Sequence, residues 1–224
     1  RLSARPAPAG VMPVVLSSGS DATRFRFSPQ HRAAVRQAYQ LRDDQVLVGN
    51  VAFLRNYKGL PFILRTAAAM PPQYRFMLVG EGSDRPQLEA LRRELGLVDR
   101  VIFTGHQEQP EHFFSAFDLF FFSSYKVEGI SQALVQGLLN GLPVLACPIP
   151  SAMEPLGLIE AYRLVDYDDV TAACQGLREL AALPPRDPVR MERQHRIVAD
   201  RYGMEPMMRT LLATYQRFGV HAPG

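Results

Sequence analysis

The stretch Asp118–Ala146, "DLFFFSSYKVEGISQALVQGLLNGLPVLA", contains one complete strand, helix and strand unit. Residues 118–124 are almost continuously apolar, as expected for a strand that is buried on both faces. An amphipathic helical pattern follows over 129–140, and a second apolar run begins at Pro143. This order and spacing predict a crossover between two parallel strands.

The same alternation extends outward through the rest of the chain. The predicted strands are 14–18, 46–53, 74–80, 100–105, 118–124, 143–148 and 162–166. Helical patterns are predicted near 29–40, 59–70, 85–96, 109–117, 129–140, 168–182, 187–201 and 204–218. The predicted fold class is therefore α/β, a Rossmann-like parallel sheet with helices on both faces. The last two helices have no strand after them, so we expect them to pack back across the domain.

Length and composition favour a single domain with a small ligand. The chain has 224 residues, of which 47% are hydrophobic and 21% are charged. We expect residues 17–224 to form one domain and residues 1–16, rich in Pro, Ala and Gly, to be a linker or chain edge. The formal charge of +3 comes from arginine, because lysine occurs only at Lys58 and Lys126. This small surplus argues against a nucleic-acid partner, but it suits an anionic ligand or an acidic membrane surface.

Cysteine and histidine placement argues against a disulfide framework or a metal centre. Cys147 and Cys174 are too few for either, which favours a reduced, cytoplasmic setting. The five histidines are scattered, and His106 alone follows a predicted strand closely enough to touch a ligand. No apolar run approaches the roughly 18 residues of a membrane span, and the first ten residues do not resemble a signal peptide. Peripheral membrane association remains an open alternative.

Ligands of such folds bind at the carboxyl ends of the strands, where helix N-termini gather. The loops expected there are 54–59, 80–84, 104–109, 123–131 and 147–154. Loop 54–59 places Arg55 and Lys58 at the start of a helix, where two cations can hold a diphosphate. Both residues could equally be solvated surface cations.

Loop 80–84, "GEGSD", has two glycines between a strand and a helix. Gly80 and Gly82 could let the backbone approach a phosphate group. A tight turn capped by Ser83 or Asp84 would use the same residues, and two glycines are a weaker signal than a full dinucleotide-binding fingerprint.

Loop 123–131 carries Glu128 immediately before the expected helix start near Gly129. Gln136 lies eight residues further along, about 12 Å on an ideal helix, which is too far for an acid and base pair across one bond. The two side chains fit better as anchors at the two ends of an elongated ligand such as a nucleotide-sugar. Alternatively, Gln136 is a buried glutamine whose amide is satisfied by neighbouring backbone.

Taken in order, these loops resemble the C-terminal, donor-binding half of the retaining GT-B glycosyltransferases of family 4, which include lipopolysaccharide and exopolysaccharide sugar transferases. The resemblance spans residues 17–218. "SSGSDATRFRF" is similar to the family's junction between domains, and "VGNVAFLRNYKG" to its phosphate-binding loop. "LVGEGSDRPQLEALRRELGLVDRVIFTG" is similar to its Gly-x-Gly loop and base-binding strand, and 118–146 to its signature region.

The resemblance also assigns roles to single residues. Glu128 matches the glutamate that contacts the sugar hydroxyls. Gln136 stands where the family has a second glutamate that holds the ribose, and its amide can still accept a hydrogen bond. The same replacement occurs in some lipopolysaccharide-type members. The family's phosphate arginine usually stands at the position of Phe53, so Arg55 would have to supply the guanidinium. Glu154 is in register with a late family glutamate.

The catalytic residues that this resemblance implies are Glu128, Lys58 and Arg55. The implied nucleotide-sugar-binding residues are Gly80, Gly82, Gly105, His106, Gln107, Gly129, Ile130, Ser131, Gln136 and Glu154. The reaction would need no metal or other cofactor, and the donor would be a UDP-, GDP- or ADP-sugar. The acceptor, a glycan or lipid-linked sugar, would bind to an N-terminal domain that this chain is expected to lack. We therefore expect the chain alone to bind nucleotide but to transfer no sugar.

Three other functions remain open at this point. The chain could be a catalytically lapsed module that binds a nucleotide or docks a partner. It could belong to a nucleotide-sugar epimerase of the same two-domain architecture, with acidic residues supplied by the other domain. A flavodoxin-like regulator fits least well, because it would have an acidic pocket where this chain has cations.

Overall fold

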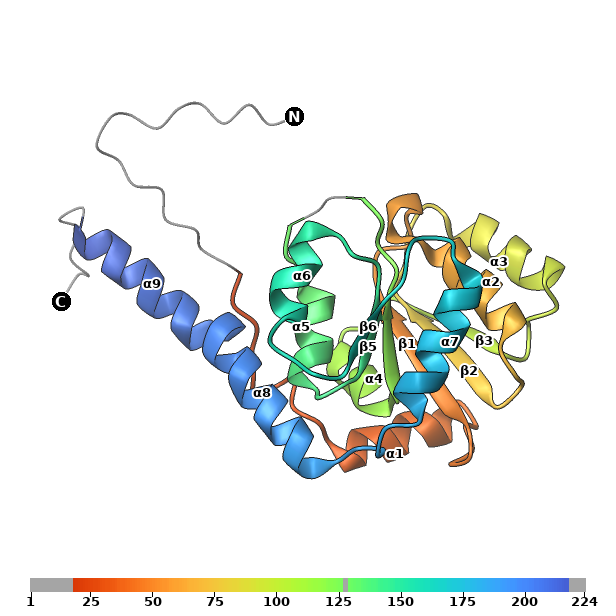
Figure 1. The fold of residues 1–224 in the computed structure, drawn as a ribbon, viewed down its shortest axis with the longest axis horizontal. Helices are drawn as coiled ribbons and strands as arrows, with labels where there is room; N and C mark the ends of the chain where they lie inside the picture. The colour runs from red at the N-terminus through yellow and green to blue at the C-terminus, as the bar shows by residue number, and fades with distance from the viewer. Residues whose placement is uncertain (1–17, 127–128, 218–224) are drawn as a thin grey trace.

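The computed structural model describes residues 18–126 and 129–217, and within them a parallel sheet lies between two layers of helices (Figure 1). The strand order is β3-β2-β1-β4-β5-β6, and every neighbouring pair is parallel. The strands are β1 Val46–Val51, β2 Tyr74–Val79, β3 Val101–Gly105, β4 Leu119–Phe122, β5 Val144–Ala146 and β6 Tyr162–Leu164. The predicted Rossmann-like α/β fold is confirmed. The strand predicted at 14–18 lies outside the described residues, apart from Ser18.

The helices follow the predicted pattern with two corrections. They are α1 Pro29–Ala38, α2 Leu60–Ala69, α3 Arg85–Glu94, α4 Pro110–Ala116, α5 Gln132–Leu139, α6 Pro150–Leu156, α7 Val170–Ala181, α8 Pro188–Tyr202 and α9 Met204–Arg217, with a 3₁₀ turn η1 Asn56–Lys58. The helix expected to start near Gly129 begins at Gln132, because Ser131 has extended backbone and caps it. Much of the expected loop 147–154 is helical, since Pro150 opens α6 with a suitable φ angle.

Two apolar layers explain why the strands read as continuous apolar runs. Phe120 and Phe122 of β4 pack into the layer under α1, α4, α5 and α8. Leu119 and Phe121, which point to the opposite face, pack into the layer under α2, α3 and α7. Because both faces are covered, no position on β4 faces water.

The strand order reverses at β1, which lies between β2 and β4. The chain therefore leaves β1 and β4 toward opposite sides, and the loops at their carboxyl ends separate. This switch point is the part of the fold where a ligand crevice is expected.

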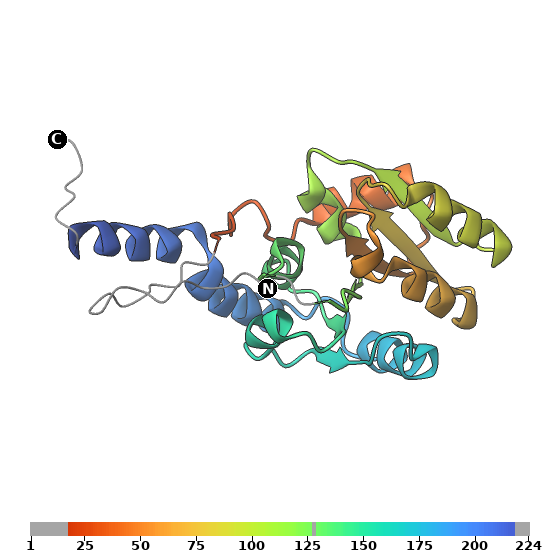
Figure 2. The same ribbon diagram turned by 90° about the horizontal axis from the view of Figure 1, so that it is seen from above.

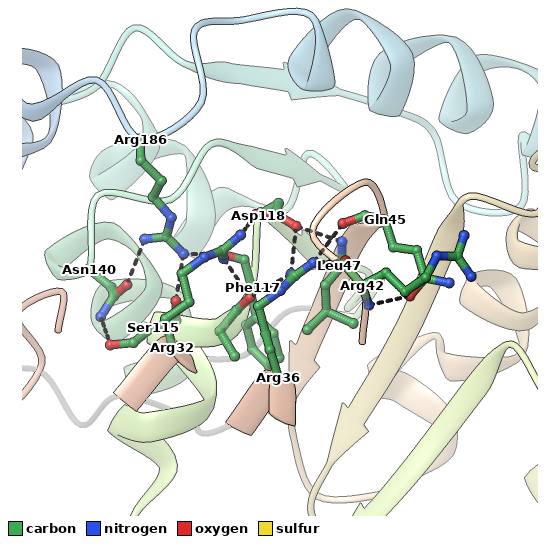
Figure 3. A network of polar contacts seen from close by, with 11 residues as sticks. Arg32, Arg36, Arg42, Gln45, Leu47, Ser115, Phe117, Asp118, Asn140 and Arg186 are labelled. Atoms are coloured by element: carbon green, nitrogen blue, oxygen red, sulfur yellow. Dashed lines mark hydrogen bonds and ion pairs between the residues drawn. The ribbon is translucent and has the colours of Figure 1, made fainter. Parts of the chain in front are cut away.

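An arginine network closes the opposite, amino-terminal edge of the sheet (Figure 3). Arg32 and Arg36 from α1 both donate to Asp118, with nitrogen to oxygen distances of 2.7 and 3.2 Å. The Asp118 carboxylate also accepts the backbone N–H of Leu47 at 2.8 Å. Arg36, whose side chain is only 5% exposed, donates further to the carbonyl of Gln45 at 2.9 Å. The network attaches α1 to the starts of β1 and β4.

Arg186, in the loop before α8, extends this network. Its guanidinium donates to the carbonyls of Ser115, at 2.8 Å, in the last turn of α4, and of Phe117, which directly follows the helix. It also reaches the Asn140 side-chain oxygen at 3.4 Å and lies over the Phe27 ring, 4.2 Å from its centroid. Carbonyls at a helix C-terminus carry partial negative charge, so Arg186 neutralises the end of α4.

The two C-terminal helices behave differently from each other. As expected, α8 packs back on the domain: Gln194 donates to the carbonyls of Leu138 at 3.0 Å and Leu142 at 3.2 Å. In contrast, α9 extends away from the sheet (Figures 1 and 2), and none of its residues is buried. At the junction between them, Ser20 pairs with Gly203 in a short parallel bridge. None of the helices in the described ranges is long and apolar enough to cross a membrane.

Candidate functional site

A cleft of about 570 Å³ opens at the carboxyl ends of β1 and β2, beside the start of α5. This is the switch point of the sheet, and the volume lies within the range of about 300–1,000 Å³ that small-ligand sites occupy. The predicted residues that line the cleft are Lys58, Gly80, His106, Gln107, Gly129, Ile130 and Ser131. The fold thus brings together residues from four of the five predicted loops.

Other predicted residues lie away from this lining. Arg55 borders a separate hollow of about 450 Å³ between η1 and α3. Glu154 is on α6, where its carboxylate pairs with Arg201 of α8 at 2.7 Å. Gly82, Gly105 and Gln136 are also not among the cleft-lining residues. Glu128 lies outside the described residues.

Lys58 ends the one-turn helix η1 and reaches the cleft. Gly59 follows in the left-handed conformation, with φ of +68°. A Cβ atom at this position would lie 2.1 Å from the carbonyl oxygen of Ser123, so no side chain fits there. The Ser123 hydroxyl in turn donates to the Lys58 carbonyl at 2.6 Å. The turn that carries the lysine is therefore fixed by the end of β4.

The glycines of loop 80–84 are required by close backbone packing. Gly80 has φ of +135°, and a Cβ atom there would lie 2.0 Å from the carbonyl oxygen of Ala52. At Gly82 a Cβ atom would lie 2.4 Å from the carbonyl oxygen of Leu54. Asp84 precedes α3, but its side chain does not cap the helix. These contacts support a tight turn, with Gly80 alone of the two glycines exposed to the cleft.

The start of α5 is tied to the N-terminal segment of the described chain. Gln132 lines the cleft, but its side chain accepts a hydrogen bond from the Ser20 hydroxyl at 2.5 Å and donates to the Ser18 carbonyl at 3.0 Å. Gln136, one turn later, is half-buried, and its side chain makes no hydrogen bond to the described residues. The amide is thus not satisfied by neighbouring backbone, which was the alternative interpretation from the sequence.

The sequence reasoning missed several lining residues. Phe53 is 72% exposed at the rim, and the Tyr57 ring lies 5.0 Å from the Lys58 Nζ atom. Glu81 also lines the cleft and forms an ion pair with Arg85. Tyr57 and Glu81 directly adjoin the predicted residues Lys58 and Gly80, so their place in the same loops was the signal in the sequence.

In the described part of the chain, the charged and titratable side chains that line the cleft are Tyr57, Lys58, Glu81 and His106. Cys147 lies beneath the β4 loop, where its thiol is 3.7 Å from the Ser123 carbonyl. Burial raises the pKa of this thiol to about 12, so it is not a nucleophile at neutral pH. Within residues 18–126 and 129–217, His, Cys, Asp and Glu side chains do not gather in groups of three or more that could hold a metal ion.

Comparisons with known proteins agree with this fold. The family model described as "Glycosyl transferases group 1" matches residues 31–198. The lipopolysaccharide core biosynthesis glycosyltransferase LpsD of Rhizobium meliloti is 34% identical over 147 residues, which cover 64% of this chain and 42% of LpsD. The O-antigen biosynthesis glycosyltransferase WclY of Escherichia coli is 29% identical over 119 residues, which cover 53% of this chain and 33% of WclY.

Solved structures share the architecture at lower identity. Anabaena HepE in complex with UDP and glucose has a TM-score of 0.81 at 22% identity, covering 91% of this chain and 56% of HepE. The C-terminal domain of the group 1 protein LpcC from Francisella tularensis has a TM-score of 0.66 at 19% identity, covering 83% of this chain and 100% of that domain. The matched part is a third to about half the length of the first curated relatives. From the extent of the family match, the chain belongs to the group 1 glycosyltransferase family.

Proposed function

We propose that this chain is the donor-binding half of a retaining glycosyltransferase. It would move a sugar from a nucleoside diphosphate sugar to a glycan or lipid-linked acceptor, in lipopolysaccharide or surface polysaccharide biosynthesis. The observation that carries the proposal is the placement of Lys58 in a cleft at the switch point of the sheet, opposite the start of α5. Further support comes from LpsD and WclY, which are named for lipopolysaccharide core and O-antigen synthesis. The complex of HepE with UDP and glucose supports a nucleotide-sugar donor.

In the proposed reaction the protein stabilises a leaving diphosphate. The Lys58 ammonium and the free N–H groups at the start of α5 would offset the negative charge that develops when the bond to the sugar breaks. Backbone around His106 and Gln107 would meet the edge of the base. Glu128 would orient the sugar hydroxyls by analogy with the family. Neither a covalent nucleophile nor a metal has a role in this scheme.

Calorimetric titration with UDP, GDP and ADP tests the proposal on the purified chain. We expect saturable binding of one of the three, weakened about 10- to 100-fold by Lys58→Ala, since a hydrogen bond to a charged group contributes about 1.5–3 kcal/mol. Arg209→Ala on α9 is the matched control, because it removes an exposed cation remote from the cleft. Absence of binding by the folded wild-type chain, or equal loss in both variants, would contradict the proposal.

A transfer assay tests our proposal that this chain binds the donor and that another domain binds the acceptor. The chain alone should show no sugar transfer to any acceptor, because acceptor contacts would come from another domain. Transfer by the purified chain would show that it holds a complete active site.

The displacement of Arg55 from the cleft and the presence of Gln136 favour one competing function, a lapsed nucleotide-binding or docking module. Gln136→Glu in the two-domain parent protein that this proposal implies separates the transferase from the lapsed module. If the parent is inactive and the substitution creates transfer activity, the site has lapsed. Activity of the unmodified parent would support the transferase.

A further inference from the structure

We infer that Tyr125 and Tyr167 are positioning residues for Lys58: their stacked rings lock the turn that places Lys58 at the cleft. The inference rests on the proposed role of Lys58 in binding the diphosphate. Neither tyrosine lines the cleft itself. Their effect would therefore pass through the backbone and not through contact with a ligand.

The β4 loop holds the lysine turn at three successive residues. The Tyr125 hydroxyl donates to the Asn56 side-chain oxygen at 3.1 Å. The Tyr125 backbone N–H donates to the Tyr57 carbonyl at 3.2 Å. The Ser123 hydroxyl donates to the Lys58 carbonyl at 2.6 Å. All of η1 is thus bonded to one short segment.

Tyr167, from the loop between β6 and α7, packs against both Tyr125 and the lysine turn. Its ring stacks on Tyr125 with centroids 4.0 Å apart and planes at 28°, and meets Phe62 of α2 edge-on at 5.6 Å. It also lies against Gly59: a Cβ atom there would be 3.1 Å from a Tyr167 ring carbon and 2.1 Å from the Ser123 carbonyl oxygen. The residue directly after Lys58 is wedged between them.

The Tyr167 ring is itself held in place by α2. The next residue, Asp168, adopts the left-handed conformation with φ of +73°, which is uncommon for a residue with a side chain. Arg65 of α2 donates from Nε to the Asp168 carboxylate at 2.9 Å. Because α2 begins immediately after Gly59, the contacts form a closed circuit from Lys58 through α2, Asp168, Tyr167 and Tyr125 back to the lysine turn.

Such a circuit matters because an ordered lysine loses less freedom when it binds a ligand. Ordering a flexible side chain and its loop on binding costs about 0.5–1.5 kcal/mol per side chain. Removal of the stack should therefore weaken contact with the diphosphate alone. Contacts with the base, which we propose to lie at His106 and Gln107, should keep their strength.

Titration of Tyr167→Ala and Tyr167→Phe with UDP and with uridine tests this distinction. We expect Tyr167→Ala to bind UDP about fivefold more weakly and uridine as well as the wild type does. Tyr167→Phe keeps the stacked ring and should match the wild type for both. Tyr39→Ala, which removes a ring packed on Phe113, is the control for general destabilisation, because neither residue lines the cleft. Unchanged UDP affinity in Tyr167→Ala, or equal losses for UDP and uridine, would overturn the inference.

A second measurement works without any ligand, because the chain contains only two lysines, Lys58 and Lys126. Reductive methylation with ¹³C-formaldehyde keeps their charge and gives one NMR signal for each, assigned with Lys58→Arg. In Tyr167→Ala the Lys58 signal should move to the position of free dimethyl-lysine, while Tyr167→Phe and Tyr39→Ala should leave it in place. An unmoved signal overturns the inference. Wild-type protein that binds no nucleotide would defeat the proposed function, and the lysine signal would still decide on positioning.

Discussion

The two edges of the sheet use positive charge in opposite ways. At the amino-terminal edge, Arg36 is buried and Arg186 is half-buried, and both guanidinium groups donate to backbone carbonyls (Figure 3). Arg36 also donates to Asp118. At the carboxyl-terminal edge, Lys58 sits on a one-turn helix beside an open cleft, and Phe53 at the rim is 72% exposed. We call the amino-terminal edge the sealed edge, because its cations bond to groups of the protein, and the carboxyl-terminal edge the open edge, because its cation lines a cleft.

The comparison shows that charge alone does not tell a structural cation from a ligand-binding one. The place of the cation and the groups around it do. Arg186 donates to the Ser115 carbonyl in the last turn of α4, and Arg190 donates to the Gly141 carbonyl just after α5. Their donors complete helix C-termini, so these residues have a structural role. The turn that carries Lys58 is held through its backbone, because the Ser123 hydroxyl donates to the Lys58 carbonyl, and Lys58 itself lines the cleft.

Removal of the acid at the sealed edge should have a large effect on stability. Asp118→Ala leaves Arg36, 5% exposed, without its carboxylate, so we expect a loss of about 3 kcal/mol in the free energy of unfolding. For a chain of this size the melting temperature should fall by about 6–12 °C. Denaturant unfolding measures the loss, and Asp44→Ala, which breaks an exposed ion pair with Arg42, should leave the midpoint unchanged. Equal effects would mean that the sealed edge is held by other contacts.

Gly59→Ala tests whether the open edge depends on close packing. The left-handed conformation alone costs alanine about 1–2 kcal/mol, and the approach to the Ser123 carbonyl should add about 1–3 kcal/mol. Gly96→Ala is the matched control, because Gly96 has φ of +66° but no atom within 4 Å of an added Cβ. The difference between the two midpoints isolates the packing cost. If both variants lose the same amount, Gly59 is required only for its φ angle.

Phe53→Arg tests whether the open edge has room for a further cation. Phe53 is 72% exposed at the cleft rim, so the substitution should leave stability unchanged. A guanidinium there should tighten nucleoside diphosphate binding about fivefold, or about 1 kcal/mol. The affinity is measured by calorimetry in low salt. Val189→Arg is the control, because Val189 is also an exposed apolar residue but lies on α8 and does not line the cleft. Weaker binding by Phe53→Arg would indicate that the ring itself contacts the ligand.

The smallest expected effect is a pH dependence near the sealed edge, where His31 of α1 stacks on His112 of α4 with centroids 3.7 Å apart. Burial, and then the neighbouring His112, lower the pKa of His31. Below the unfolded value of about 6.5 the unfolded chain therefore binds more protons than the folded one, and stability falls as the pH falls. His31→Gln should lose less stability than the wild type between pH 7.5 and 5.5 in thermal unfolding. If His31→Gln and the wild type lose the same stability over this pH range, His31 does not contribute to the pH dependence.

Much of the fold could be predicted because a parallel strand that is buried on both faces is recognisable as a continuous apolar run in the sequence. Leu119–Phe122 is apolar at every position, and both faces of the sheet are indeed covered. The switch-point rule then located the cleft, including Lys58 and Gly80. In contrast, α6 was missed because Pro150 and Pro155 suggest a loop, although proline is favoured at the first position of a helix.

The sealed edge could not be predicted at all. Arg36, Asp118 and Arg186 are separated by more than sixty residues each, and nothing in their local sequence distinguishes them from solvated charges. Their pairing depends on where α1, β4 and the loop before α8 meet in space. The same holds for Gln132, whose partner Ser20 lies 112 residues away.

The bridge between Ser20 and Gly203 also bears on protein engineering. The Ser20 backbone N–H donates to the Tyr202 carbonyl at 2.8 Å, and the Met204 N–H donates to the Ser20 carbonyl at 3.0 Å. The segment from Ser20 to Gly203 therefore begins and ends at neighbouring positions in space. A circular permutant that joins these ends by a short peptide and opens elsewhere, for example at Gly96, would keep every strand of the sheet in its order.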